Sequence, residues 1–289
     1  MEPLVDRRFV GRSQGQNTPM GVHPILRAER AMTILSGPDS SPIETRFGAG
    51  RWWICIYGLT CYTAGVTGLV ALILLTLGTL PVTGGLLALR GDLSRTAFNL
   101  GLVAAFGVQH AAMASAGFKR WFRRALPATV ERLTLTAMAG LLVVVLVWLW
   151  QPLPARLWHA ETVVLRHALL GLCAAGWSYL LLATFAIDHF ELFGVKQAWR
   201  YLTGKPTPEP ALRVTLMYRF DRHPIMTGVL VGIWSAPTMT LDRLVMALGF
   251  TGYIIVGVAI EERALRLKHG VAYERYARRV RSIVPPLPR

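Results

Sequence analysis

The sequence has few charged residues for its length. Asp, Glu, Lys and Arg make up 16% of its 289 residues, against about 25% in an ordinary soluble domain. So little charge cannot cover a water-facing surface, and a hydrophobic content of 53% excludes a disordered chain. Acidic residues are scarcest, since 16 of them stand against 31 Lys and Arg. A nucleic-acid-binding protein would share this basic excess but not the hydrophobicity, so we interpret the chain as a polytopic membrane protein and expect no nucleic-acid partner.

Several chemical signatures are also missing. Cys55, Cys61 and Cys173 lie within hydrophobic runs and show no disulfide or metal-site spacing, so we interpret them as packing residues. The sequence contains no glycine-rich phosphate or dinucleotide motif, no zinc-protease motif and no nucleophile-elbow motif. No predicted helix pairs a His with a carboxylate three or four residues away, as a metal site would require. We therefore predict no catalytic metal and no soluble nucleotide-binding or hydrolase fold.

The first fifty residues differ in amino-acid composition from the rest of the chain. Residues 1–50 hold six Arg and five acidic residues with Ser, Gly and Pro between them, and no hydrophobic run of signal-peptide length. We expect a flexible cytoplasmic tail here. Residues 51–187 then contain four transmembrane helices, and residues 188–289 contain a cytoplasmic linker, a helical hairpin and a C-terminal binding segment.

The membrane helices are predicted from run length. A bilayer-spanning helix needs about 17–25 apolar residues. The runs of about this length are Trp52–Gly78, Ala97–Gly117, Leu133–Trp150 and Val163–Ile187. A further apolar region, Ile225–Ile260, is interrupted near Pro237 and Asp242, so we predict a tight helical hairpin with a short first limb. The fold class we expect is an all-α polytopic membrane bundle of five to six transmembrane helices.

Basic residues are distributed unevenly between the two sides of this topology. Of the 31 Lys and Arg, 26 fall in segments 1–51, 119–132, 196–222 and 263–289, which share one side, and five fall on the other. Basic loops face the cytoplasm. We therefore expect an integral protein of a bacterial inner membrane with both termini in the cytoplasm.

Polar residues gather at the cytoplasmic ends of the predicted helices. Such residues are costly at membrane depth and are functional candidates. The groups are Gln109-His110, Glu131-Arg132, Asp188-His189, Asp221-Arg222-His223 and Glu261-Glu262. Because all five lie toward one face, we predict a buried polar site that is open to the cytosol.

Three of these groups also have a simpler interpretation, in which they pack or pair locally. These alternatives are a packing histidine at 110, a helix-start acid at 131 beside a snorkelling Arg132, and ion pairs from Glu261-Glu262 to Arg263 or Arg266.

The C-terminal segment is strongly basic. It reads as a helix that stops near Gly270, a second short helix with Tyr273 and Tyr276, and a stop at Pro285-Pro286. This pattern fits an amphipathic segment on anionic membrane lipid. It equally fits a lid that carries the two tyrosines over a cofactor.

The last third of the chain resembles a known superfamily. Arg222-His223-Pro224-x-x-x-Gly228, Glu261-Glu262 and Gly270-x-x-Tyr273-x-x-Tyr276 are similar to the C-terminal half of the isoprenylcysteine carboxyl methyltransferases. Earlier segments resemble the methanethiol S-methyltransferases, which are relatives of the NnrU-type proteins. These segments are Gln109-His110, Phe118–Phe122, Glu131-Arg132, Gly176-Trp177, Asp188–Gly194 and Trp234–Thr240. Two positions depart from the pattern: Met226 replaces an aromatic residue, and Asp188 stands where Asn is expected.

The resemblance implies S-adenosylmethionine as the co-substrate, held between the last hairpin and the C-terminal segment. The binding residues would be Arg222, His223, Pro224, Gly228, Glu261, Glu262, Tyr273 and Tyr276. The glutamates would supply negative potential near the sulfonium cation, and the tyrosines would add cation–π attraction. His223 or Arg222 would bind the cofactor's carboxylate, or His223 its adenine edge.

The resemblance also implies a small thiol acceptor, with methanethiol converted to dimethyl sulfide and hydrogen sulfide as a second candidate. Thiolate is the reactive form. As the proton acceptor we predict His110, or His189 paired with Asp188; alternatively Arg132 would stabilise the anion. Residues expected to contact the substrate are Gln109, Glu131 and Phe190.

Two other functions stay open from the sequence. A membrane-bound NAD(P)H-dependent reductase would share the superfamily's C-terminal half, with more basic side chains around residues 222–224 for the cofactor's phosphates. The other open function is that of a non-enzymatic partner of a respiratory or denitrification membrane complex, by analogy with the NnrU-type relatives.

Overall fold

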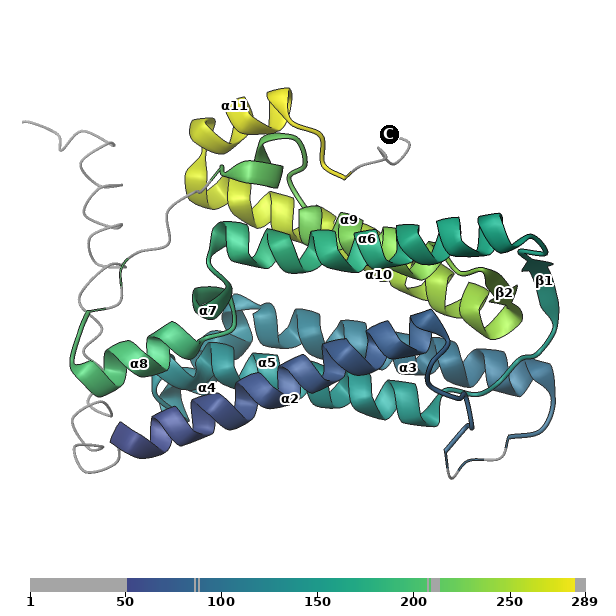
Figure 1. Ribbon diagram of the computed structural model, residues 1–289. Helices are drawn as coiled ribbons and strands as arrows, with labels where there is room; N and C mark the ends of the chain where they lie inside the picture. The colour runs from purple at the N-terminus through teal and green to yellow at the C-terminus, as the bar shows by residue number, and fades with distance from the viewer. Residues whose placement is uncertain (1–50, 86, 88, 207, 209–213, 284–289) are drawn as a thin grey trace, which may run out of the picture. The chain divides into compact units, whose positions relative to one another are not determined.

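The computed structural model describes residues 51–283 apart from positions 86, 88, 207 and 209–213 (Figure 1). All of these residues belong to one compact unit. The predicted tail over residues 1–50 and the predicted stop at Pro285-Pro286 lie outside the described residues.

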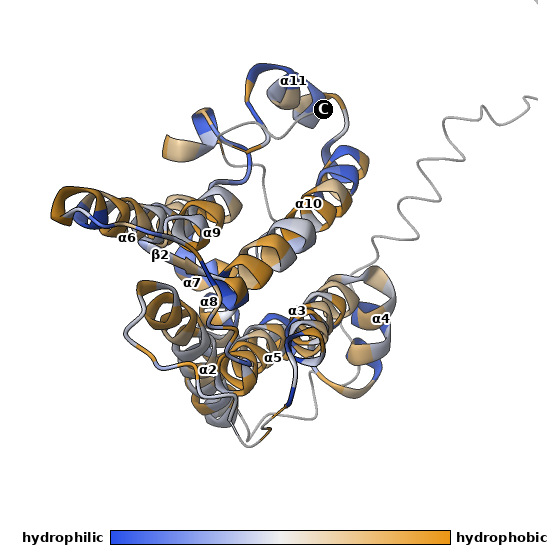
Figure 2. Cartoon of the chain, turned by 90° about the vertical axis from the view of Figure 1, so that its right-hand side faces the viewer, coloured by the Kyte–Doolittle hydropathy of each residue, from blue (hydrophilic) through white to orange (hydrophobic). Residues whose placement is uncertain are grey.

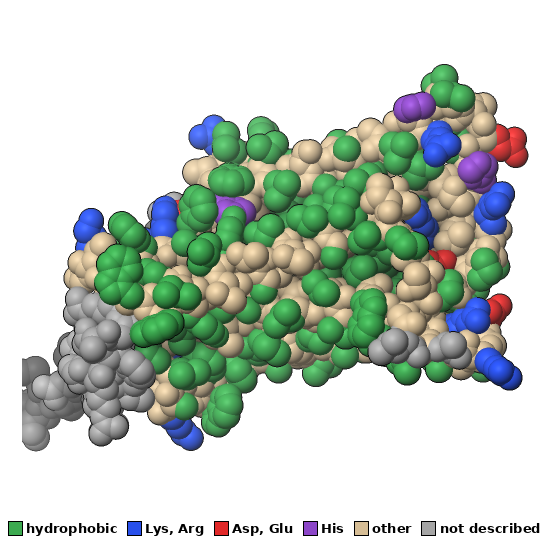
Figure 3. Space-filling model, turned by 60° about the horizontal axis from the view of Figure 1, so that its bottom comes forward, with side chains coloured by type: hydrophobic (Ala, Val, Ile, Leu, Met, Phe, Trp, Pro, Cys, Tyr) green, Lys and Arg blue, Asp and Glu red, His purple; other side chains and the backbone are tan. Residues whose placement is uncertain are grey.

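Within the described residues, five helices are long and apolar enough to cross a membrane. They are α2 (Arg51–Leu77), α3 (Asp92–Ala114), α5 (Ala128–Leu149), α6 (Val163–Ile187) and α10 (Leu241–His269). The shortest has 22 residues, and at 1.5 Å per residue it is about 33 Å long, against about 30 Å for a bilayer core. Hydrophobic side chains cover the middle of the surface shown in Figure 3, and Lys and Arg lie toward its two ends. The chain is an all-α integral membrane protein, as predicted.

The predicted hairpin is present, but its first limb is not a full-length helix. Helix α9 (Pro224–Trp234) has 11 residues, about 16 Å or half the bilayer core. The chain continues to β2 (Thr238–Thr240), which pairs antiparallel with β1 (Arg156–His159). Strand β1 follows α5 and precedes α6 in the sequence. The limb therefore reaches the far end of the bundle through a short helix followed by a non-helical segment. Pro237 cannot continue a helix, and β1 supplies the hydrogen bonds that lipid could not.

The two ends of the bundle differ in structure (Figure 1). We call the end that carries β1 and β2 the sheet end. The opposite end, where α10 meets α11, is called the tail end. The short helices there are α4 (Ala116–Ala125), α7 (His189–Leu192), α8 (Val195–Thr203), η2 (Leu216–Arg219) and α11 (Val271–Arg279). All five predicted polar groups lie toward the tail end.

Glycines set the closest helix contacts. A Cβ atom on Gly68 of α2 would lie 2.6 Å from the Cα of Gly140 on α5, and one on Gly228 of α9 would lie 2.6 Å from the carbonyl oxygen of Gly176 on α6. Lipid tails give helices no hydrophobic reason to associate, so such close backbone approach supplies much of the packing. Helix α10 contacts both α3 and α9, and Figure 2 shows it between these two helices.

Candidate functional site

Glu262, near the end of α10, is the centre of a network of ion pairs and hydrogen bonds. Its Oε1 accepts from Arg222 Nε at 3.0 Å and from Ser282 Oγ at 2.7 Å, and its Oε2 accepts from Arg266 Nη2 at 3.0 Å. His223 Nε2 lies 3.3 Å from Oε1. We call these five residues the Glu262 cluster. The side chains of Glu262 and Arg222 are each 10% exposed, so the pair is largely shielded from water.

Arg222 also holds the chain that follows α11. Its Nη1 donates to the carbonyl oxygens of Ala277 at 2.7 Å and Val280 at 2.8 Å, and its backbone N–H donates to Arg281 at 2.9 Å. Most of the five guanidinium N–H groups are therefore occupied by the protein itself. These contacts bring together three motifs that are far apart in the sequence. They leave Arg222 few donors for the predicted cofactor carboxylate.

Asp221 orders the turn into α9. It is fully buried, and its Oδ1 accepts from the backbone N–H of His223 at 2.9 Å. Burial raises the pKa of Asp221, and hydrogen bonds from the Thr227 and Tyr179 hydroxyls partly offset the rise. His223 is the N-cap residue, and Pro224 fills the first helical position. The sequence placed Asp221 in a predicted polar group but assigned it no binding or catalytic role.

Glu261 differs from its neighbour in being accessible. Its side chain is 52% exposed, and its Oε2 lies 3.6 Å from His223 Nδ1. Its charge also acts on Tyr218 of η2. Glu261 therefore lies close to the start of α9, with a carboxylate available to a cation.

Three tyrosines lie close to these carboxylates. The rings of Tyr273 and Tyr276 meet edge to face at 5.9 Å, and Tyr276 donates to the carbonyl oxygen of Tyr218 at 2.6 Å. Tyr273 is buried, and its hydroxyl has no hydrogen-bond partner among the described residues. Burial, and after it the Glu262 carboxylate, raises the pKa of Tyr273 to about 12, so this phenol is a hydrogen-bond donor at neutral pH. Burial also raises the pKa of Tyr218, the third of these tyrosines. The sequence analysis did not predict Tyr218 as a site residue.

A cavity of about 360 Å³ lies beside the Glu262 cluster. It is lined by Arg222, Ile255, Val258, Glu262 and residues 277–283. Small-molecule sites commonly occupy about 300–1,000 Å³. Met226, which replaces the expected aromatic residue, packs against a hydrophobic cluster that includes two of these lining residues, Val258 and Ile283. It contributes a flexible thioether here and no ring for stacking.

His110 lies on α3 and packs against α10. Its ring stacks on Phe106 at 5.8 Å and meets the ring of Tyr253 on α10 edge to face at 6.3 Å. His110 Nδ1 and Gln109 Oε1 are buried and have no hydrogen-bond partner in the described part of the chain. Buried polar atoms are rarely left unsatisfied, so two of them together indicate a place for a ligand. Tyr253 was not predicted, because an aromatic residue in an apolar helix resembles any core residue.

His189 lies in a different environment. Its Nε2 is 2.9 Å from the Tyr62 hydroxyl and its Nδ1 is 2.8 Å from the Thr184 hydroxyl. Its ring stacks on Phe185 at 4.3 Å and meets Phe190, a predicted substrate contact, edge to face at 5.3 Å. Both ring nitrogens lie at hydrogen-bond distance from hydroxyl groups, and the Asp188 carboxylate acts on His189 through its charge. The pairing of the two residues in catalysis stays a prediction.

The Asp188 carboxylate stabilises the turn between α6 and α8. It pairs with Lys196 and accepts from the backbone N–H of Glu191 at 3.2 Å, which caps α7. Asp188 has a φ of 124°, a conformation that Gly, Asn and Asp tolerate better than other residues. This geometry explains why Asn or Asp is suited to the position, and it gives Asp188 a role in the backbone turn.

Glu131 and Arg132 lie near the start of α5, and neither is one of the partners just described for His110 and His189. Glu131 is buried and pairs with Arg123 at 2.8 Å and Lys119 at 3.7 Å, which joins the start of α5 to α4. Arg132 is exposed. The simpler interpretation of Glu131 as a structural acid is therefore supported, with partners on α4 in addition to its helix-start position. Contact of either residue with substrate stays a prediction.

Gly228 and Pro224 complete the predicted cofactor residues. Gly228 faces the backbone of α6, where Gly176 and Leu180 fill the space next to it. Pro224 is buried at the first position of α9. Both shape the helix that presents His223, and direct contact with a cofactor stays a prediction for each.

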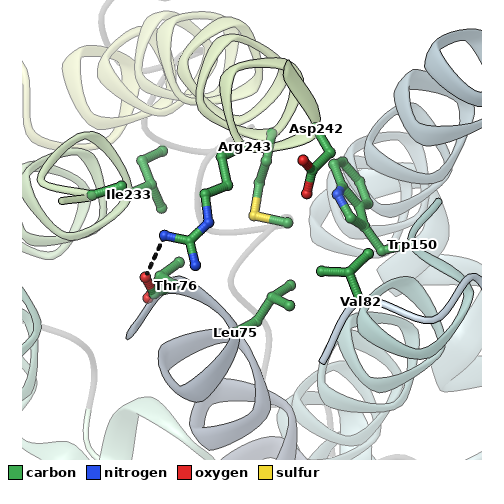
Figure 4. Close-up of a pocket in the computed structure, with 9 residues that line it drawn as sticks. Leu75, Thr76, Val82, Trp150, Ile233, Asp242 and Arg243 are labelled. Carbon is green, nitrogen blue, oxygen red and sulfur yellow. Dashed lines mark hydrogen bonds between the residues drawn. The ribbon is translucent and has the colours of Figure 1, made fainter. Parts of the chain in front are cut away.

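A second, smaller pocket lies at the sheet end (Figure 4). Its volume is about 20 Å³, room for about one water molecule. Arg243 donates to the carbonyl oxygen of Thr76 at 3.3 Å, and the buried Trp150 Nε1 has no partner among the described residues. This pocket is too small for a cofactor. Within the described residues, no group of three His, Cys, Asp or Glu side chains is arranged to hold a metal ion.

The chain was compared with known proteins. It is 42% identical over 187 residues to methanethiol S-methyltransferase of Mycobacterium tuberculosis, which covers 65% of this chain and 77% of that protein. It is 31% identical over 236 residues to methanethiol S-methyltransferase of Crocosphaera subtropica, which covers 81% of this chain and 92% of that protein. Nurim of Sus scrofa is 28% identical over 207 residues, 66% of this chain and 79% of Nurim. No family model and no solved structure matches the chain.

Proposed function

Because the chain belongs to the methanethiol S-methyltransferase family, we propose that it transfers a methyl group from S-adenosylmethionine to methanethiol and releases dimethyl sulfide. This membership agrees with the motifs read from the sequence. Among the observations on the site, the one that carries the proposal is Glu261, an accessible carboxylate 3.6 Å from His223 of the Arg-His-Pro motif.

The residues at the tail end suit a sulfonium compound. A sulfonium cation is attracted by a carboxylate and by aromatic faces. Glu261 supplies the carboxylate, and Tyr218, Tyr273 and Tyr276 supply rings and phenol groups close to it. The first turn of α9, led by His223, supplies backbone N–H groups suited to a carboxylate.

Arg222 itself suits a phosphate-bearing cofactor poorly, but Arg278, Arg279 and Arg281 also line the cavity, so the family membership is what weighs against the reductase alternative. NADPH would need free basic side chains near the Arg-His-Pro segment. Arg222 is occupied by Glu262 and by two carbonyl oxygens, and Glu261 adds negative charge beside it. No observation on the described residues favours a purely structural partner role.

When bound, S-adenosylmethionine supplies an electrophilic methyl group. The protein's part is to generate and align the thiolate, because the thiol itself is a poor nucleophile. His110 Nδ1 lies unpartnered beside Gln109 Oε1, so it would accept the proton as the thiol S–H bond breaks. The thiolate sulfur would then bond to the methyl carbon while the bond from that carbon to the sulfonium sulfur breaks, and S-adenosylhomocysteine would leave with the electron pair. Alignment of the two reactants between α3 and α10 would contribute several kcal/mol.

We also propose that the tail end faces the cytosol across a bacterial inner membrane. The segments that the sequence assigns to this side of the membrane carry 26 of the 31 basic residues, which is the pattern of cytoplasmic loops. S-adenosylmethionine is made in the cytosol, so this orientation gives the site direct access to its co-substrate.

Calorimetric titration of the detergent-solubilised protein tests the cofactor assignment. We expect S-adenosylhomocysteine to bind and NADPH not to bind. His223→Ala should weaken S-adenosylhomocysteine binding, whereas His167→Ala at the exposed start of α6 is the matched control and should leave it unchanged. NADPH binding without S-adenosylhomocysteine binding would support the reductase. Binding of neither, with a stably co-purifying protein, would support the non-enzymatic role.

A further inference from the structure

Gly107 on α3 lies directly against the ring of Tyr253 on α10. A Cβ atom at Gly107 would lie 2.9 Å from Cδ2 and 3.5 Å from Cε2 of that ring. A contact of 2.9 Å is shorter than real Cβ atoms make, so any larger residue at 107 would displace the ring. The lack of a side chain at Gly107 is what lets Tyr253 approach the α3 backbone.

Other aromatic residues hold Tyr253 in this place. Its ring meets Phe106 edge to face at 5.4 Å and Phe250 at 6.5 Å. Phe250 is buried in the main hydrophobic core, and Phe106 packs against that core. The position of the Tyr253 ring is therefore fixed from three sides, by Gly107, Phe106 and Phe250.

The remaining side of the ring faces the polar end of α3. The Tyr253 and His110 rings are perpendicular, with centroids 6.3 Å apart. His110, which contacts Tyr253, has a buried Nδ1 atom without a hydrogen-bond partner among the described residues. The same is true of Oε1 of Gln109, its neighbour in the chain. A rigid apolar wall beside one proton acceptor and one amide oxygen suits a ligand with a single S–H group and a very short alkyl chain.

We propose that Gly107 and Tyr253 together set the size of the thiol that the enzyme accepts. This inference rests on the proposed function and deepens it by assigning acceptor size to two residues. The Tyr253 ring, held against Gly107, occupies the volume that the second and third carbons of a longer thiol would need. A change of one methylene in an apolar site alters discrimination by about 10–200-fold. A smaller side chain at 253 should therefore relax the preference for methanethiol.

The test compares kcat/KM for methanethiol, ethanethiol and 1-propanethiol in the purified full-length protein, with S-adenosylhomocysteine formation as the readout. In Tyr253→Leu, the ratio of kcat/KM for 1-propanethiol to that for methanethiol should rise about tenfold or more. Tyr253→Phe keeps the ring and should keep the wild-type ratio. Tyr57→Leu is the matched control, because Tyr57 lies on α2 and bonds Thr134 at 2.8 Å.

A ratio is used because general damage lowers turnover of every thiol together and leaves the ratio unchanged. If Tyr253→Leu does not fold, Tyr253→Met provides the same measurement with a flexible side chain. An unchanged ratio in a folded variant that binds S-adenosylhomocysteine would overturn this inference alone. Absence of turnover with every thiol in the wild type would overturn the proposed function, and this inference with it.

Discussion

The Arg222 guanidinium group and the Glu262 carboxylate form a shielded ion pair, with Nε 3.0 Å from Oε1, that fastens the C-terminal segment to the start of α9. Arg222 completes the link by donating to the carbonyl oxygens of Ala277 and Val280. Glu261, the residue before Glu262, takes no part in this pair, and its side chain is half exposed. Adjacent glutamates therefore have different tasks: Glu262 holds the site together, and Glu261 is available to a cation.

Glu262→Gln should lower the stability of the protein markedly. Loss of the charge leaves Arg222 largely buried without its counter-ion, and breaking such a pair costs about 3–5 kcal/mol. Thermal unfolding in detergent measures the effect. Glu161→Gln, an exposed acid near the start of α6, is the control and should unfold like the wild type. An unfolding temperature for Glu262→Gln equal to that of the control would refute the structural role.

Glu261→Gln should change affinity and not stability. Its carboxylate would attract the sulfonium of S-adenosylmethionine but gain nothing from the uncharged sulfur of S-adenosylhomocysteine. For an exposed charge the attraction is about 1 kcal/mol, which corresponds to about fivefold in affinity. The ratio of the two dissociation constants, measured by titration, should shift by that factor. The exposed Glu274→Gln on α11 serves as control, and an equal loss for both ligands would contradict the assignment.

The pH dependence of stability should carry a contribution from His189. Burial lowers the pKa of His189 from its ordinary value of 6.5, and the Asp188 carboxylate partly opposes the shift. The unfolded chain then takes up the proton first as the pH falls. The stability is thus present above about pH 6.5 and decreases as the pH drops through that value. His189→Gln should flatten the wild-type loss of unfolding temperature between pH 7.5 and 5. Parallel curves for the two proteins would show that His189 does not contribute.

The α2–α5 crossing should tolerate no side chain at Gly140. A Cβ atom there would lie 2.5 Å from the Cα of Gly65, so the two helices would have to separate. Overpacking of this kind costs about 1–3 kcal/mol, and we expect Gly140→Ala to unfold at a lower temperature. Gly252→Ala on α10 is the matched control, since nothing lies within 4 Å of its Cβ position. Equal unfolding temperatures for the two variants would disprove the tight crossing.

The membrane helices were predictable because the bilayer imposes both their length and their composition. The run Val163–Ile187 coincides with α6 residue for residue. The first limb of the hairpin was not predictable in the same way. Residues 235–240 carry no charge, and run length alone does not distinguish a helix from an extended segment that forms hydrogen bonds with β1.

The candidate site was predictable where polar residues stand out in an apolar chain, as His110 and the Arg-His-Pro motif do. Their neighbours were not, because Tyr253 and Tyr218 look like packing residues until a partner is seen beside them. The expected pairing of Asp188 with His189 appears as an influence of charge, because hydroxyl groups occupy both ring nitrogens of His189. Adjacent residues at a turn point in different directions, and the positive φ of Asp188 turns its carboxylate toward Lys196.

The central claim is that this protein makes dimethyl sulfide from methanethiol and S-adenosylmethionine. The most direct test is headspace gas analysis of the purified, full-length protein supplied with both compounds, with S-adenosylhomocysteine measured in the same vial. The account predicts dimethyl sulfide and S-adenosylhomocysteine in equal amounts, and neither product when S-adenosylmethionine is omitted. Folded protein that binds S-adenosylhomocysteine but yields no dimethyl sulfide above the enzyme-free control would contradict it.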